Sequence, residues 1–113
     1  MKFPNKPPFE QKGLKGFAYP LINKDLEIYY VDSSQGHDNF IISKKCFHIY
    51  YIIEGNGTFE INNQIKEVSK NFLIEVPPNL EYTYSGKMKL LLIMNPPWFA
   101  DNEEITKKNR NVK

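Results

Sequence analysis

A chain of 113 residues is long enough for one ordinary hydrophobic core and too short for two. Its residues are 41% hydrophobic and 14% aromatic, which excludes an intrinsically disordered chain. The net charge of +2 comes from lysine-rich ends, and the body between Lys24 and Lys89 has nine acids against seven bases, so we expect no nucleic-acid partner.

Nothing in the sequence indicates export or membrane insertion. The single cysteine, Cys46, cannot form an intrachain disulfide, and the start of the chain lacks the apolar stretch of a secretory signal. The longest purely apolar run, residues 90–94, is far too short to cross a bilayer. We therefore expect a cytoplasmic protein with no membrane partner.

Three segments are predicted along the chain. Residues 1–15 hold three prolines and four lysines without a sustained period, which indicates an extended N-terminal arm. In residues 16–104, short runs rich in β-branched and aromatic residues alternate with Asn, Gly, Asp, Lys and Pro. This pattern is typical of an all-β antiparallel sandwich or barrel. Residues 105–113 are interpreted as a basic C-terminal tail.

Several connections have a recognisable turn chemistry. The "EGNG" of residues 54–57 and the "NNQ" of residues 62–64 provide residues that tolerate positive φ, so we expect two turns and a meander over residues 49–68. From Asp101, "DNEEITKKNR" has acids first and bases last, which predicts a short C-terminal turn or helix. "NPPWF", residues 95–99, is expected to pack under the barrel or across a dimer.

Two long predicted strands are apolar on both faces. In the first, His48 and Tyr50 alternate with Ile49 and Tyr51, and the strand over residues 88–94 has the same character. A strand with two apolar faces must be covered on both sides. We interpret the outer face as a homodimer interface, in preference to a monomer covered by its own folded-back arm.

The spacing of several residues resembles the two motifs of the cupin superfamily. Gly36 and Gly55 fall on the two glycines of the first motif and Pro77 on the proline of the second, while Asn71 and Asn79 replace glycines. The phrases "IYYIIEGNGTFEI", "FLIEVPPN" and "LLIMNPPWFADNE" are also similar to those of small single-domain cupins. The resemblance covers about residues 17–104 and implies a cupin-type double-stranded β-helix, a jelly-roll barrel.

The same resemblance implies that the metal-binding motifs are degenerate. Ile42, Lys44, His48 and Tyr82 fall in the slots that metal-binding cupins fill with two histidines, a glutamate and a third histidine. An isoleucine cannot coordinate a metal, a lysine must first lose its proton, and a neutral tyrosine is a weak ligand. We therefore expect no metal and no other cofactor.

The candidate ligand-binding residues follow from the same barrel geometry. The resemblance implies that the barrel interior contains Lys44, His48, Tyr50, Tyr82 and Tyr84. An imidazole and phenols, with or without the amine, suit a sugar or sugar-derived molecule. The alternative is that His48 and Tyr82 only satisfy each other as a buried polar pair.

Three functions remain open on the sequence. We expect a metal-free module that binds a small molecule. A second possibility is a sugar isomerase or epimerase that uses His48 and Tyr82 as catalytic base and acid, similar to some metal-free cupins that act on nucleotide-linked keto-sugars. The only arginine, Arg110, lies in the tail, which disfavours a nucleotide substrate. The third possibility is a structural dimer without a ligand.

Other polar residues are interpreted without a function. Cys46 is expected in the core, because small buried cysteines are common. His37 lies beside Asp38 in the loop-like "SSQGHDN", where we expect a solvated histidine. Glu54 and Glu75 are expected at the surface or the rim of the barrel.

Overall fold

The computed structural model describes Pro4 and residues 8–113. Within this part of the chain it contains ten strands and no helix, and hence no helix that could cross a membrane. In chain order the strands are β1 (Phe9–Gln11), β2 (Leu14–Ala18), β3 (Glu27–Ser33), β4 (Asn39–Ser43), β5 (Phe47–Ile61), β6 (Gln64–Ser69), β7 (Leu73–Val76), β8 (Glu81–Ser85), β9 (Met88–Asn95) and β10 (Glu103–Lys108). The all-β prediction is confirmed.

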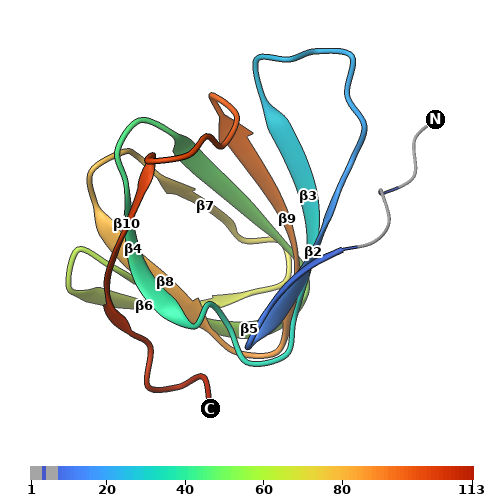
Figure 1. The fold of residues 1–113 in the computed structure, drawn as a ribbon. Coiled ribbons are helices and arrows are strands. Elements are labelled where there is room, and N and C mark those ends of the chain that lie inside the picture. Colours follow the sequence, from blue (N-terminus) through green and yellow to red (C-terminus); the bar gives the residue numbers. More distant parts are fainter. Residues whose placement is uncertain (1–3, 5–7) are drawn as a thin grey trace.

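The strands form two antiparallel sheets that curl around a common interior (Figure 1). One sheet has the order β1-β2-β3-β9-β5-β7, and the other has the order β6-β5-β8-β4-β10. Strand β5 belongs to both sheets, because residues 47–55 pair with β9 and residues 56–61 pair with β6. One long strand therefore joins the two halves of the jelly roll.

A bend in β5 replaces the first predicted turn. The pairing with β9 changes register between Ile52 and Glu54, and Gly55 has a φ of +87°. A Cβ atom at Gly55 would lie 2.3 Å from the carbonyl oxygen of Lys87, so only glycine fits there. The prediction of a hairpin turn at residues 54–57 is wrong. The register shift at Ile53 and the positive φ of Gly55 bend the strand where it passes from one sheet to the other.

The second predicted turn is confirmed. Asn62 and Asn63 have φ values of 49° and 66°, and they connect β5 to β6. Asparagine tolerates this left-handed conformation better than other residues with a side chain, which is why the sequence signal is reliable here.

The C-terminal segment continues as a strand. After a turn at residues 100–102, β10 pairs with β4 from Glu103 opposite Ser43 to Lys108 opposite Asn39. The helix considered from the sequence is not present, because pairing satisfies the open edge of β4 along the whole segment. The charge order that favours a helix contributes only about 0.3–1 kcal/mol.

The core lies between the two sheets. Val31, Leu90 and Ile52 lie opposite one another on β3, β9 and β5 and form a row with almost no exposed surface. Phe59 fills the interior from the second half of β5. Cys46 is also fully buried, which confirms its predicted place in the core.

Candidate functional site

The barrel contains a cavity of about 400 Å³, within the range of small-molecule sites. Its polar lining includes His37, His48, Tyr50, Tyr82, Tyr84 and Glu103. Leucine, valine, isoleucine and methionine side chains make up much of the remaining wall. A mostly apolar cavity with a few convergent polar groups is the usual form of a ligand site.

Alternation along two strands positions four of these side chains. His48 and Tyr50 are buried on β5, while Ile49 between them is half-buried and Tyr51 after them is exposed. Tyr82 and Tyr84 come from β8 and are almost fully buried. The structure therefore places all four in one cavity, as expected, and their roles in binding or catalysis stay predictions.

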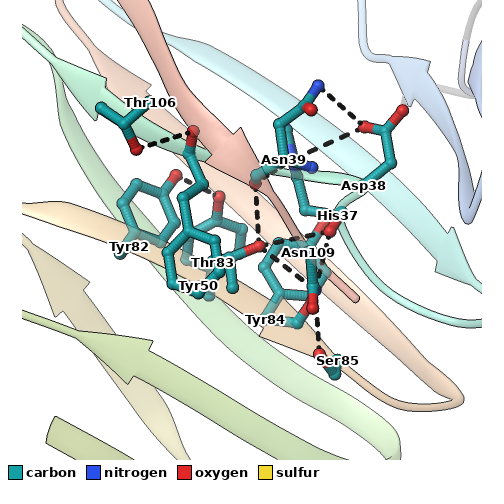
Figure 2. A network of polar contacts seen from close by, with 11 residues as sticks. His37, Asp38, Asn39, Tyr50, Tyr82, Thr83, Tyr84, Ser85, Thr106 and Asn109 are labelled. Atoms are coloured by element: carbon teal, nitrogen blue, oxygen red, sulfur yellow. Dashed lines mark hydrogen bonds and ion pairs between the residues drawn. The ribbon is translucent and has the colours of Figure 1, made fainter. Parts of the chain in front are cut away.

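Tyr50, Tyr82 and Tyr84 form a tyrosine cluster in the cavity wall (Figure 2). The Tyr50 and Tyr82 hydroxyl oxygens are 2.6 Å apart, and the Tyr84 ring centre is 5.4 Å from that of Tyr50. The His48 ring lies 5.7 Å from Tyr82, whereas the His37 ring lies 6.1 Å from Tyr84. The cavity thus has one histidine at each end of the tyrosine cluster.

The three tyrosines remain protonated at neutral pH. Burial raises the pKa of each hydroxyl well above its usual range. A protonated hydroxyl can both donate and accept a hydrogen bond. The cluster therefore offers uncharged hydrogen-bonding groups to a ligand.

The loop between β3 and β4 holds His37 in the cavity wall. Gly36 has a φ of +122° and forms a bridge with Ser85, and the His37 backbone N–H donates to the Tyr84 carbonyl at 3.0 Å. The His37 side chain is only 14% exposed. The expectation of a solvated loop histidine is wrong, because these long-range backbone contacts fold the loop onto the barrel.

The surroundings of His37 fix its protonation. Nδ1 lies 2.8 Å from the carbonyl oxygen of Asn39 and 3.2 Å from the backbone nitrogen of the same residue. The shorter contact is to an oxygen that can only accept, so we assign the proton to Nδ1 and the lone pair to Nε2. Burial lowers the pKa of His37. A neutral imidazole with a free lone pair can serve as a base.

Asn109 connects the C-terminal segment to this loop (Figure 2). Its side-chain amide donates to the His37 carbonyl and to Ser85 Oγ, each at 2.9 Å, and its backbone N–H donates to the Asp38 carbonyl. Asn109 is only 4% exposed. The segment after β10 thus braces the loop that carries His37.

His48 is a neutral and incompletely bonded histidine. Its side chain is 2% exposed, and burial lowers its pKa to about 4. Nε2 lies 3.9 Å from Oε2 of Glu103, and Nδ1 has no hydrogen-bond partner within the described residues. Burial also raises the pKa of Glu103, and the nearby Trp98 indole lowers it.

Lys44 is not part of the cavity. It is exposed in the turn between β4 and β5 and does not line the interior, so the placement expected for it is wrong. The alternation that places His48 and Tyr50 begins at Phe47, where β5 starts, and cannot be extended back through the turn.

The metal-binding slots of the family do not contain a metal-binding set. Ile42 has no donor atom and Lys44 is exposed, which leaves His48 and Tyr82. In the part of the chain that the structure describes, no group of three or more His, Cys, Asp or Glu side chains could hold an ion. In the cavity, His48 and Glu103 are the two neighbouring side chains best suited to coordinate a metal ion.

Sequence reasoning missed several residues of the cavity wall. Glu103 comes from β10, in a stretch expected to form a C-terminal turn or helix, and Phe9 and Gln11 come from β1, in the segment interpreted as an arm. Trp98 lines the cavity with about half of its surface exposed, although packing was favoured for "NPPWF" over a role in stacking on a ligand. The acidic pair at residues 103–104 was the one signal that could have suggested Glu103.

The chain is similar in sequence or in fold to several known proteins. No protein-family model matches the chain. An uncharacterised protein of Methanocaldococcus jannaschii is 34% identical over 61 residues, and the match spans about half of each chain. The cupin domain of Schizosaccharomyces pombe Cnp3 superposes with a TM-score of 0.67 at 18% identity, over 77% of this chain and 66% of that one. The chain has the cupin fold.

A second solved structure covers almost the whole cupin barrel. Pac13 from Streptomyces, described as a nucleoside dehydratase, matches with a TM-score of 0.86 at 22% identity, over 93% of this chain and 87% of its own. Its structures with uridine include one variant with a histidine replaced by glutamine and two variants with a tyrosine replaced by phenylalanine. Identity at this level shows a shared fold and leaves the function open.

Proposed function

We propose that this cupin barrel binds an uncharged nucleoside without a metal ion and eliminates water from it. The main support is a match of spacing. In the Pac13 variants with uridine, the first substituted tyrosine follows the substituted histidine by 13 residues, and the second follows after 34 more. His37, Tyr50 and Tyr84 have the same spacing and line one cavity.

The protonation state of His37 suits the removal of a proton from carbon. Its pKa is lowered by burial, so the ring is neutral at pH 7, and its Nδ1 proton is bound by the Asn39 carbonyl. Nε2 is then the basic atom. Asp38 Oδ1, 3.8 Å from Nδ1, stabilises the imidazolium that forms after proton removal.

His37 alone can carry out both proton transfers of a dehydration. His37 removes a proton from a carbon next to the one that bears the hydroxyl, and the imidazolium then returns that proton to the leaving hydroxyl. A C–H and a C–O bond break, a C=C bond forms, and water departs without an oxidant or reductant. Tyr50 and Tyr84 donate hydrogen bonds to oxygens that gain negative charge.

The other candidate functions have less support. The isomerase hypothesis assigns the base and acid to His48 and Tyr82, whereas the spacing match involves His37, Tyr50 and Tyr84 and includes neither of these two residues. A structural dimer without a ligand needs an interior filled by its own side chains, whereas this barrel has a cavity of about 400 Å³.

Mass spectrometry tests the proposal. Purified protein is incubated with uridine and with uridine derivatives that carry a carbonyl on the sugar, since a carbonyl acidifies the neighbouring C–H bond. We expect loss of one water from at least one of them, and a rate at least about a hundredfold lower for His37→Gln. Tyr51→Phe, outside the cavity, should leave the rate unchanged. No product from any nucleoside, or a product that His37→Gln forms at the full rate, would contradict dehydration through His37.

A further inference from the structure

His48 and Glu103 lie at the other end of the tyrosine cluster from His37. Their closest atoms, Nε2 and Oε2, are 3.9 Å apart, which is beyond hydrogen-bond distance. Nδ1 of His48 also has no partner among the described residues, although the side chain is 2% exposed. Because a buried polar atom without a partner is costly, a ligand that bonds to it completes the site.

The two side chains offer complementary hydrogen-bonding groups. The neutral His48 ring has one N–H donor and one acceptor nitrogen. The Glu103 carboxylate offers acceptor oxygens and is 30% exposed, so a ligand can reach it from the cavity. A ligand that presents a donor to Glu103 and an acceptor to the N–H of His48 fits both side chains.

The charge of the cavity restricts the ligand further. The described residues that line it include no lysine or arginine, and Glu103 is an acid. A phosphate group would therefore find no counter-charge and would be repelled by the carboxylate. These charges disfavour an anionic ligand at this end of the cavity.

Aromatic side chains also line the wall. Phe9, Tyr29 and Trp98 all border the cavity, and the Phe9 and Tyr29 rings meet edge to face at 5.5 Å. Glu27 accepts hydrogen bonds from the Tyr29 hydroxyl and the Trp98 backbone N–H, so it holds both residues in place. Such a wall suits a flat, partly apolar ring.

We propose that His48 and Glu103 form a subsite that binds the N–H and C=O edge of an uncharged heterocyclic base. The ring N–H of the base donates to Glu103, and the adjacent carbonyl accepts from His48. The inference rests on the proposed function for the choice of a nucleoside, and it assigns the base to this end and the sugar to the His37 end.

Nuclear magnetic resonance titrations with two small probes test the subsite without a sugar. 1-Methyluracil has the free N–H and C=O edge, whereas in 1,3-dimethyluracil the same nitrogen is methylated. We expect 1-methyluracil to shift the His48 imidazole signals and to bind about tenfold or more tightly than the dimethyl compound, as loss of a hydrogen bond to a charged group implies. Equal binding of the two probes, or no binding of either, overturns the proposal.

Two variants separate this proposal from the proposed dehydration. Glu103→Gln should weaken 1-methyluracil about tenfold and leave 1,3-dimethyluracil unchanged, whereas equal weakening of both probes contradicts the assigned role of Glu103. His37→Gln should leave the binding of both probes unchanged, since it alters only the sugar end. If dehydration fails but the probes are still discriminated, the subsite stands. The two probes test it on the unmodified protein even if a variant does not fold.

Discussion

The hydroxyl oxygens of Tyr50 and Tyr82 lie 2.6 Å apart in the interior of the barrel, and each residue has at most 2% of its surface exposed. Tyr50 comes from the first half of β5 and Tyr82 from β8, so this hydrogen bond joins the two sheets. The rings pack with their centres 6.0 Å apart. The hydrogen-bonded pair therefore lies in the middle of the cavity, with His48 at one end and His37 at the other.

Removing one partner of this bond should destabilise the barrel. We expect Tyr82→Phe to lower the free energy of unfolding by about 1–2 kcal/mol, because the Tyr50 hydroxyl then loses its buried partner. The matched control is Tyr51→Phe, which removes an exposed hydroxyl bonded to Asn71 and should cost less than about 0.5 kcal/mol. Urea unfolding measures the stability of both variants. Equal losses of unfolding free energy would show that the buried hydrogen bond stabilises the fold no more than the exposed one.

Acid should destabilise the fold through His48. Its pKa is about 4 in the folded chain and ordinarily 6.5, so below pH 6.5 the unfolded chain binds the proton and the folded chain does not. Stability is therefore full above pH 6.5 and falls as the pH approaches 4, with about 2 kcal/mol lost from this residue by pH 5.

Other groups near His48 modify this dependence. His37, whose pKa is also lowered, acts in the same direction, whereas the raised pKa of Glu103 acts in the opposite direction. Tyr50 and Tyr82 do not titrate in this range, because burial raises their pKa values. Urea unfolding at pH 7.5 and pH 5 should show a smaller loss for His48→Gln than for the unmodified chain. An identical loss in both would mean that His48 is not buried in its neutral form.

The residues that sequence reasoning placed well belong to strands with a clear alternation. His48, Tyr50, Tyr82 and Tyr84 could be assigned to one interior from period-two spacing and the family's motif. Their hydrogen-bond partners could not be assigned, because the 2.6 Å contact between Tyr50 and Tyr82 depends on a register that spacing does not fix.

The residues that were missed depend on long-range pairing. His37 enters the wall because its loop bonds to β8, and Glu103 enters because β10 pairs with β4. Apart from the acidic pair at residues 103–104, the local sequence gives no signal for either contact, and the loop-like composition around His37 indicated solvent. Gly55 shows the same limit, since a positive φ occurs in a hairpin turn as well as in the bend found here.

Asn109 should be a positioning residue for the His37 loop. Asn109→Ala removes the side-chain bonds to the His37 carbonyl and Ser85, and we expect a loss of about 1–3 kcal/mol in unfolding free energy. Amide exchange at His37, whose N–H is bonded to Tyr84, should accelerate more than exchange in β9.

A neighbouring residue provides the control for this test. Asn111 is exposed and donates to Ser85 at 3.2 Å, so Asn111→Ala should change stability by less than about 0.5 kcal/mol. If Asn109→Ala leaves exchange at His37 at the level of this control, the C-terminal segment does not brace the loop.

The outer face of the first sheet should form a homodimer. Tyr30, Leu91, Tyr51 and Leu73 lie opposite one another across β3, β9, β5 and β7, with Tyr51 37% and Leu73 66% exposed. Sedimentation analysis should show a dimer that Tyr51→Glu converts to a monomer. Ile65→Glu, on exposed β6 of the other sheet, should remain dimeric. A monomeric unmodified chain would contradict this interface.

Uridine titrated against the isotopically labelled protein tests the central claim most directly. The chain has two histidines, His37 and His48, and both line the cavity, so their imidazole signals report its two ends without ambiguity. If a nucleoside spans the cavity, both signals should shift together with one dissociation constant. Uridine that shifts neither signal at saturating concentration, or that shifts the two with different constants, would contradict a nucleoside bound between them.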